Sequence, residues 1–348
     1  MNMIQTNDVR IQDIRPLMAP FLLKEEISMT EMSNRTVVEG RGKISAILGK
    51  KDPRLLAIIG PCSIHDAEAA LEYSRRLKAL ADEVKEKIFI VMRVYFEKPR
   101  TSIGWRGLIL DPYMDDSCEI ELGLRIARKL LTDITGLGVP AGSEMLDPIV
   151  PQYIADLISW AAIGARTTES QTHREMASGL SMPVGFKNGT SGNLQLAVDA
   201  MRSTSHSHSF IGIDQNGQTC VLKTSGNSDG HIILRGGRIG PNYYEENVEE
   251  AERLVRAAGR EPAVVVDCSH ENSGKSADRQ ERVLRSIIDQ RRRGRHSIVG
   301  FMLESNLLGG SQVIPADKKD LIFGCSVTDE CLSWEDTKAI ITDAYNAL

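Results

Sequence analysis

This chain of 348 residues has no excess of basic residues and no long apolar run. Each of these absences excludes a class of protein. Lys and Arg number 42 against 47 Asp and Glu, for a net charge of −5. No nucleic-acid partner is expected, because binding a phosphate backbone needs a clustered basic excess. No run approaches the ~18 consecutive apolar residues of a membrane span, so no membrane association is expected. The composition, with 41% hydrophobic and 26% charged residues, is that of an ordinary globular protein.

Cysteine is also sparse. The six cysteines lie at positions 62, 118, 220, 268, 325 and 331 and form no CxxC pair. A disulfide framework is not expected in so long a chain with scattered cysteines, which predicts reduced thiols. The first fifteen residues lack the basic and apolar regions of a secretory signal. Both observations predict a cytoplasmic protein.

From residue 55 onward, short apolar runs of strand length alternate with amphipathic stretches of helix length, a pattern typical of parallel β/α units. The runs are Leu55–Gly60, Ile88–Tyr95, Gly138–Glu144, Ala161–Arg166, Val184–Lys187, His231–Arg235, Ala263–Cys268 and Ile298–Glu304. Between them the apolar residues keep a helical period. One helical face holds Ala70, Tyr73, Leu77, Leu80 and Val84, a second holds Val248, Ala251, Leu254, Val255 and Ala258, and a third holds Val283, Leu284, Ile287 and Ile288. A last helix is expected at about Trp334–Ala347.

Eight strand–helix pairs predict an α/β protein of the (β/α)8 TIM barrel type, which leaves no open strand edge. A doubly wound open sheet is the alternative. It predicts GxGxxG after the first strand, and residues 60–65 (GPCSIH) do not supply it.

Two segments exceed the needs of a barrel, and they set the expected domain organisation. Residues 1–50 are polar with short apolar clusters, which predicts an N-terminal arm that docks without a core of its own; residues 51–348 are the expected barrel. Residues 203–229, between the fifth and sixth runs, contain two strand-like stretches around the turn signal Asn216-Gly217. This segment predicts a β-hairpin inserted between barrel strands 5 and 6.

A polar residue stands at or just after the end of each run, and in a barrel these residues meet at one mouth. They are Cys62, Arg93, Glu144, Arg166, Lys187, Arg235, His270 and Glu304. Each alone is compatible with a solvated strand end, but eight in register favour a site. Residues 273–276 (SGKS) resemble the end of a P-loop, but the first glycine is replaced by Ser269, so this motif is rejected.

The strand-end residues divide into two chemistries. Four cations, Arg93, Arg166, Lys187 and Arg235, are joined by Lys98 and Arg100 of the following loop and suit phosphate and carboxylate groups. Local structural ion pairs are the alternative for these cations. The mixed set Cys62, His270, Glu304 and Asp329 suits one divalent Mn, Fe, Co or Zn ion better than Mg. Considered alone, Cys62 is compatible with a buried thiol, and His270 with a general base or a core residue.

These residues lie in long strings that resemble the 3-deoxy-D-arabino-heptulosonate-7-phosphate (DAHP) synthases of class I, the short microbial type. The strings include IIGPCSIHD (58–66), VMRVYFEKPRT (91–101), HIILRGG (231–237) and VVDCSHENS (265–273), and a 28-residue string at 163–190. The resemblance runs from about residue 52 to the C-terminus. It implies a transferase that condenses phosphoenolpyruvate (PEP) with erythrose 4-phosphate and water, giving DAHP and phosphate, at the first step of the shikimate pathway.

The resemblance also implies residue roles. It makes Cys62, His270, Glu304 and Asp329 the metal ligands. Arg166, Lys187 and Arg235 hold the PEP phosphate, with Ala165 and Glu144 beside them, and Arg93 with Lys187 holds the PEP carboxylate. Lys98, Arg100 and Thr101 hold the erythrose phosphate. The implied catalytic set is Lys187, Cys62, His270 and Glu144. The metal polarises the aldehyde or activates a water, and Glu144 and Lys187 are both candidates to position water or to move protons. Glu271 departs from the small residue usual in the family after the metal histidine.

Members of this family are inhibited by an aromatic amino acid that binds away from the chemistry. The resemblance places that pocket near Gln152, Met176, Leu180, Ser181, Phe210 and Gly212. The string SQTHREMASGLSMPVGF (170–186) is most similar to the tyrosine-sensitive branch, with tryptophan and phenylalanine as alternatives. The resemblance further implies a homodimer or a homotetramer.

Two other functions are compatible with parts of this pattern. One is a metal-dependent barrel enzyme that joins PEP to a different phosphosugar aldehyde. The other is a barrel that has lost catalysis and only senses amino acids. The complete set of expected ligands and cations favours the DAHP synthase interpretation over both.

Overall fold

The computed structural model describes residues 4–100 and 103–348, and its centre is a closed barrel of parallel strands. The strands follow one another around the barrel in the order β1-β10-β9-β8-β5-β4-β3-β2. Their bounds are β1 Leu55–Gly60, β2 Ile88–Arg93, β3 Ala141–Glu144, β4 Trp160–Ile163, β5 Val184–Lys187, β8 Gly230–Leu234, β9 Val264–Asp267 and β10 Ile298–Glu304. Each expected run overlaps one barrel strand, and β4 and β8 each begin one residue before the run. The TIM-barrel prediction is confirmed and the open-sheet alternative is wrong.

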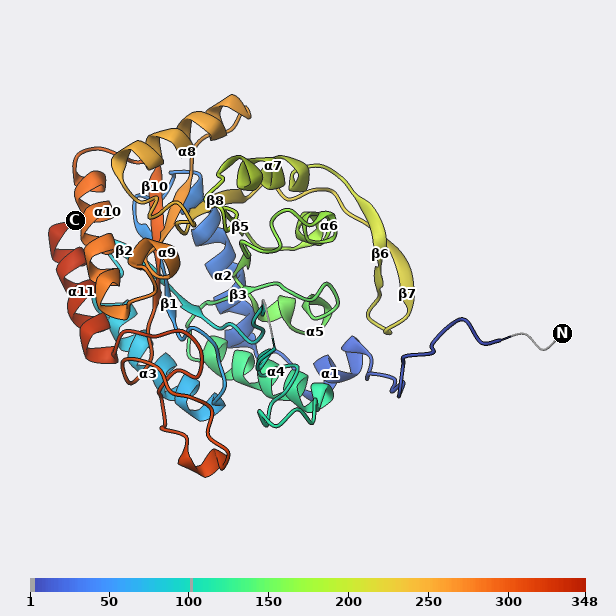
Figure 1. Ribbon diagram of the computed structural model, residues 1–348. Coiled ribbons are helices and arrows are strands. Elements are labelled where there is room, and N and C mark those ends of the chain that lie inside the picture. The colour runs from blue at the N-terminus through green and yellow to red at the C-terminus, as the bar shows by residue number, and fades with distance from the viewer. Residues whose placement is uncertain (1–3, 101–102) are drawn as a thin grey trace.

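Helices surround the barrel (Figure 1). Those that follow strands are α3 Ala67–Val84, α4 Ile120–Gly136, α5 Pro151–Ile154, α6 Gln171–Gly179, α7 Gln195–Thr204, α8 Glu245–Ala257, α9 His270–Ser273, α10 Gln280–Arg292 and α11 Trp334–Ala347. Short 3-10 turns occupy Ala155–Leu157, Ala277–Arg279 and Lys318–Asp320. The cap of α3 is typical, since the Asp66 side chain accepts hydrogen bonds from the backbone of Glu68 and Ala69. The predicted apolar face of this helix is buried.

The apolar core has two parts, because successive strand residues point to opposite faces. In β1, Leu55, Ala57 and Ile59 pack toward the surrounding helices, whereas Leu56 and Ile58 fill the barrel interior. Strand β3 begins three residues later than expected. Gly138 has φ +81°, and Pro140 has no backbone N–H to donate, so the chain joins the sheet only at Ala141.

The N-terminal fifty residues contain two helices, α1 (Pro20–Glu26) and α2 (Glu31–Leu48), where the sequence predicted only docking clusters. Helix α2 contributes Ile44 and Ile47 to the interior core of the barrel. This helix is therefore part of the packed structure, whereas the segment before α1 extends away from the body (Figure 1).

The hairpin inserted before the sixth barrel strand has the predicted form. Strands β6 (Ser209–Ile213) and β7 (Thr219–Lys223) pair antiparallel and stand away from the barrel (Figure 1). At the hairpin tip, Gln215 accepts a hydrogen bond from the backbone of Phe21 at 2.9 Å and donates one to Gln152 at 2.8 Å. The hairpin thereby joins the N-terminal segment to α5. No helix within residues 4–100 and 103–348 has the length and apolar character needed to cross a membrane.

Candidate active site

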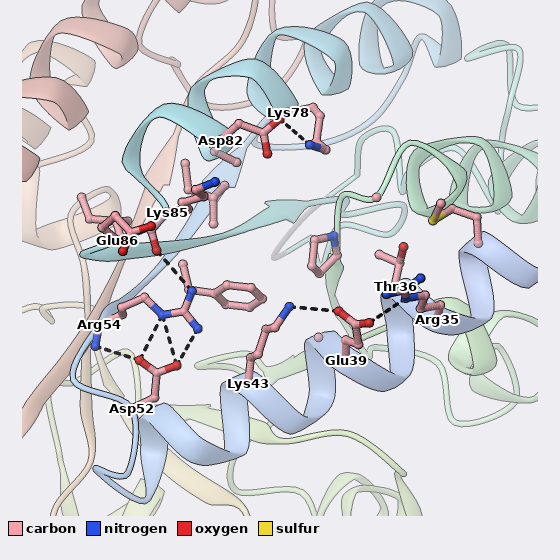
Figure 2. A pocket seen from close by; sticks show the side chains of 18 of the residues that line it. Arg35, Thr36, Glu39, Lys43, Asp52, Arg54, Lys78, Asp82, Lys85 and Glu86 are labelled. Atoms are coloured by element: carbon pink, nitrogen blue, oxygen red, sulfur yellow. Dashed lines mark hydrogen bonds and ion pairs between the residues drawn. The ribbon is translucent and has the colours of Figure 1, made fainter.

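A cavity of about 610 Å³ lies between α2, α3 and β2 near the start of the strands, and its chemistry does not favour a ligand site. Figure 2 shows four of its cations, Arg35, Lys43, Arg54 and Lys78, paired with carboxylates of the same wall. Glu39 is 2.8 Å from Arg35 and 3.1 Å from Lys43, and Arg54 hydrogen-bonds to Asp52. Such paired charges are typical of a solvated surface groove.

A second cavity, of about 320 Å³, lies at the carboxyl ends of the strands, where TIM-barrel enzymes carry their sites. Nine of the predicted site residues line it: Lys98, Arg100, Glu144, Ala165, Arg166, Lys187, Arg235, His270 and Asp329. Three others, Cys62, Arg93 and Glu304, are fully buried behind the lining. Cys62 contacts Lys98, and Glu304 lies 3.8 Å from His270. Arg93 hydrogen-bonds in turn to Cys62 and Glu304. Thr101 lies outside the described residues. The structure therefore brings together the predicted residues that it describes.

The end of β1 places Cys62 deep in the mouth. Gly60 permits this course, since a Cβ at that position would lie 2.5 Å from the carbonyl oxygen of Arg93. The Cys62 thiol accepts a hydrogen bond from Lys98 Nζ at 3.1 Å and lies 3.8 Å from Asp329 Oδ2. Burial, and then the neighbouring Glu304, raise the pKa of Cys62, although Lys98 and Arg93 act in the opposite direction.

The residues proposed as metal ligands have a geometry that fits a divalent ion. One donor atom each from Cys62, Glu304 and Asp329 lies within 4.8 Å of the others. His270 Nε2 is 3.8 Å from Glu304 Oε1. Two ligands that hold one ion at ~2.3 and ~2.1 Å in a tetrahedron stand about 3.6 Å apart, close to the separations seen here. The mixed thiolate, imidazole and carboxylate set favours a transition metal over magnesium.

The backbone at His270 is strained. This residue follows β9 and has φ +53°, a left-handed conformation that few residues other than glycine adopt. Its Nδ1 lies 2.9 Å from Asp267 Oδ2, so Nε2 is the nitrogen that faces Glu304. Strain of this kind is concentrated at functional sites.

The predicted cations differ in how many of their N–H donors have a hydrogen-bond partner in the protein. Arg93 donates to Glu304 Oε1 at 2.8 Å and to the carbonyl oxygens of Pro61 and Cys62, both at 3.0 Å. Its NH1 is buried without a hydrogen-bond partner among the described residues. The same holds for Nε and NH1 of Arg235, whose NH2 is paired with Glu271. Buried donors without a protein partner indicate a place for a ligand.

Glu144 and Lys187 lie at the ends of β3 and β5, the two strands that flank β4 in the barrel. Both side chains line the cavity and are largely buried. Gly164 makes room for the carboxylate, because a Cβ there would lie 2.1 Å from Glu144 Oε1. The Lys187 ammonium donates to Asp267 Oδ2 at 2.9 Å. A carboxylate and an ammonium thus face one anion-binding space.

Several lining or contacting residues were not singled out from the sequence. Asp267 is the last residue of β9 and is fully buried, whereas the residue that the sequence predicts for the end of this strand is His270. Lys275 lines the cavity but belongs to the motif rejected as a P-loop. Cys331, which had no expected partner, accepts a hydrogen bond from the backbone of Cys62 at 3.4 Å. Asp267 was detectable as a strand-end carboxylate.

The residues predicted for effector binding lie on α5 and α6 or just after α6, and on the hairpin strand β6. Gln152 is in α5, Met176 is in α6 and Leu180 follows it, while Phe210 and Gly212 are in β6. Met176 is buried, Leu180 and Phe210 are half-buried, and Ser181 is exposed. Hydrogen bonds from Gln215 to Gln152, and between Ser178 and Thr224 at 2.7 Å, join the hairpin segment to α5 and α6.

Comparisons with known proteins agree with this geometry. Residues 29–342 match the model of the DAHP synthetase I family. The Tyr-sensitive phospho-2-dehydro-3-deoxyheptonate aldolase of Escherichia coli K12 is 52% identical over 98% of this chain and 96% of that protein. The Phe-sensitive aldolase of the same organism is 50% identical over 99% of this chain and 98% of its own length.

A solved structure from Francisella tularensis SCHU S4, described as a phospho-2-dehydro-3-deoxyheptonate aldolase, shares the fold. It superposes with a TM-score of 0.94 at 45% sequence identity, covering 97% of this chain and 98% of that one. Both the sequence match and the structural match extend over nearly the whole length. The chain therefore belongs to the DAHP synthetase I family.

Proposed function

We propose that this protein condenses PEP with erythrose 4-phosphate and water, giving DAHP and phosphate, in the cavity at the carboxyl ends of the strands. The observation that carries the proposal is the meeting there of a cationic wall and a cluster of metal-ligand side chains. Membership of the family supports the reaction, which is the first step of the shikimate pathway. The protein is accordingly a transferase.

The anion-binding residues form two groups, one for each substrate. Arg166, Lys187 and Arg235 hold the PEP phosphate, since guanidinium groups bind phosphate oxygens in pairs. The free NH1 of Arg93 and Lys187 hold the PEP carboxylate. Arg100 and Thr101 hold the phosphate of erythrose 4-phosphate together with Lys98, whose ammonium lies beside the Cys62 thiol.

A single divalent ion, held by Cys62, His270, Glu304 and Asp329, supplies a Lewis acid for the aldehyde oxygen when bound. The cations stabilise the negative charge that develops as C3 of PEP bonds to the aldehyde carbon. Glu144 and Lys187 orient the water whose oxygen bonds to C2, and they move its protons. Phosphate leaves from C2 and takes the former bridging oxygen with it.

Steady-state assays test the reaction and the substrate directly. PEP consumption is measured with erythrose 4-phosphate and, separately, with arabinose 5-phosphate. PEP should be consumed with erythrose 4-phosphate and not with arabinose 5-phosphate. A preference for arabinose 5-phosphate would contradict the assignment. Cys62→Ser should abolish metal-dependent turnover, whereas the matched variant Cys118→Ser, at an exposed thiol, should retain it. Undiminished turnover of Cys62→Ser would refute the ligand assignment.

The same proposal includes feedback inhibition by an aromatic amino acid, with tyrosine favoured. Relatives of this chain carry names that specify Tyr or Phe sensitivity. We place the pocket between β6 and α6, near Gln152, Met176, Leu180, Ser181, Phe210 and Gly212. DAHP formation is measured with Phe, Tyr and Trp in turn. Phe210→Ala should relieve the inhibition and Ser209→Ala, exposed on the same strand, should not. Inhibition by none of the three would refute this part.

A homodimer or homotetramer and a cytoplasmic location complete the proposal. Residues 1–50 serve assembly and regulation on this interpretation, and 51–348 form the catalytic barrel with the hairpin 203–229. Exposed apolar side chains on the extended N-terminal segment and on the hairpin support association; they include Ile4, Ile14, Ile211 and Val221. Light scattering after size exclusion is expected to give a dimer or a tetramer, and a monomer would refute it. Six free thiols support a reducing compartment.

A further inference from the structure

One carboxylate at the end of β9 has no assigned role and yet contacts both halves of the candidate site. Asp267 has no solvent exposure. Its Oδ1 accepts hydrogen bonds from the backbone and the hydroxyl of Ser269, at 3.0 and 2.6 Å. Its Oδ2 accepts from Lys187 Nζ and is paired with His270 Nδ1, each at 2.9 Å. Four donors thus occupy two oxygen atoms.

On the metal side, Asp267 fixes the imidazole of His270. A hydrogen on Nδ1 directed at Oδ2 leaves the lone pair of Nε2 free, and Nε2 is the atom that faces Glu304. Metal-bound histidines commonly donate their second nitrogen to a carboxylate, which fixes the tautomer and increases the basicity of the ligand. The Ser269 hydroxyl, 2.8 Å from the same Nδ1, is itself held by Asp267.

On the substrate side, Asp267 fixes the ammonium of Lys187. The side chain of this lysine is 4% exposed, and its ammonium lies 6.0 Å from the centre of the Tyr95 ring. Asp267 is the carboxylate paired with it among the described residues. Since Lys187 comes from β5 and Asp267 from β9, this pair also joins the two strands that flank β8.

We propose that Asp267 is a positioning residue that sets the tautomer of His270 and the orientation of Lys187 through the same oxygen atom. The inference rests on the proposed function, which makes His270 a metal ligand and Lys187 a substrate-binding residue. Because Oδ2 serves both donors, a change at one of them alters the hydrogen bond available to the other. Asp267 thereby couples the metal site to the PEP site.

Asp267→Asn tests the metal side. In either orientation, the amide NH2 group replaces one of the two carboxylate oxygens and faces two hydrogen-bond donors. The variant would therefore lose the contacts either with Lys187 and His270 or with the backbone and hydroxyl of Ser269. The Kd for Mn²⁺, measured by chelator competition, is expected to rise by about 10- to 100-fold. The matched control is Asp156→Asn, which disturbs a carboxylate paired with the buried Arg128 outside the cavity. The control should keep the wild-type Kd. A wild-type Kd in Asp267→Asn would overturn the proposal.

Steady-state kinetics at saturating Mn²⁺ test the substrate side. Asp267→Asn removes the negative charge that competes with PEP for Lys187, but it also releases the ammonium from its position. We expect kcat to fall by about 10- to 100-fold while the KM for PEP does not rise. A higher KM with unchanged kcat would overturn the proposal. If the wild-type protein neither binds Mn²⁺ nor forms DAHP, the proposed function fails; if it does both and Asp267→Asn matches it, only this inference fails.

A measurement on the wild-type protein covers the case in which Asp267→Asn does not fold. ¹⁵N chemical shifts of the His270 ring report the tautomer, and they are assigned by comparison with His270→Asn. We expect a hydrogen on Nδ1 in the metal-free protein, directed at Asp267. Hydrogen on Nε2 would overturn the proposed role of Asp267.

Discussion

His231 provides a test of the fold in which the sign and the magnitude both follow from the structure. Its side chain lies in β8 and has no solvent exposure. His231 Nε2 accepts a hydrogen bond from the indole of Trp160 at 3.1 Å. Burial lowers the pKa of His231 from 6.5 to about 4, because the charged imidazolium is disfavoured away from water. The ring is therefore neutral in the folded protein at pH 5.

The difference in pKa makes folding stability depend on pH. Below pH 6.5 the unfolded chain binds a proton at His231 that the folded protein does not bind, so stability rises with pH across this range. One pKa unit corresponds to about 1.4 kcal/mol, and the interval between 6.5 and about 4 corresponds to about 3 kcal/mol. His231 therefore imposes no penalty above pH 7, and its penalty grows to that value as the pH falls to 4.

The assay is urea unfolding followed by far-ultraviolet circular dichroism between pH 5 and 7.5. The reference variant is His231→Gln, whose amide oxygen can still accept from Trp160 but does not titrate. The free energy of unfolding of the wild type should fall more steeply with decreasing pH than that of the variant. The difference in slope should approach 1.4 kcal/mol per pH unit, since other titrating groups cancel in the comparison. Parallel pH profiles would refute the reasoning.

Three further predictions concern separate regions. Glu271→Ala should lower the KM for PEP, measured by steady-state kinetics, by about threefold to tenfold. The reason is that the partly exposed Glu271 carboxylate pairs with Arg235 and so competes with PEP, and such an ion pair is worth about 1 kcal/mol. A higher KM would contradict this prediction. Ile47→Ala should reduce the free energy of unfolding by about 2–5 kcal/mol, since Ile47 of α2 is 1% exposed and packs with the interior core residues of the barrel. Val38→Ala, at an exposed position on the same helix, should change the free energy of unfolding little. Glu97→Gln should raise the melting temperature at pH 8 and leave it nearly unchanged at pH 4. Burial and Asp147 raise the pKa of Glu97 to about 8, so the wild type loses stability as pH rises from 4.5 toward 8, and equal effects at both pH values would contradict this.

The barrel could be predicted from the sequence because its strands are buried on both faces and stand out as apolar runs between amphipathic helices. The N-terminal helix α2 could not. Its buried stripe is narrow, with Val37, Ile44 and Ile47 toward the protein. It also contains Gly40 and Gly42, which lower helix propensity. Gly40 lies close to the barrel, since a Cβ there would be 2.9 Å from Ser159 Oγ. Packing against the barrel therefore stabilises a helix that local preference disfavours.

The site could be predicted to the level of residue types, because parallel strands deliver their last residues to one mouth. The pairings within it could not. Arg93 with Glu304, Arg235 with Glu271, and Lys187 with Asp267 each join residues from different strands or their loops. These contacts depend on side-chain directions that only the closed barrel sets. The distribution of free and satisfied donors, which distinguishes the binding cavity from the groove of Figure 2, is therefore a property of the three-dimensional structure.

Closure of the barrel by β1 and β10 has a consequence for synthesis of the chain. Leu56 pairs with Gly300, and Gly60 with Glu304. One edge of β1 therefore stays unpaired during synthesis until β10, 244 residues later in the chain, has been made. Translation at about 5–20 residues per second delays that partner by roughly 12–50 s. During this interval the apolar strand β1 has an unpaired edge, which is prone to aggregation. Chaperone binding to ribosome-bound chains should therefore persist until β10 emerges.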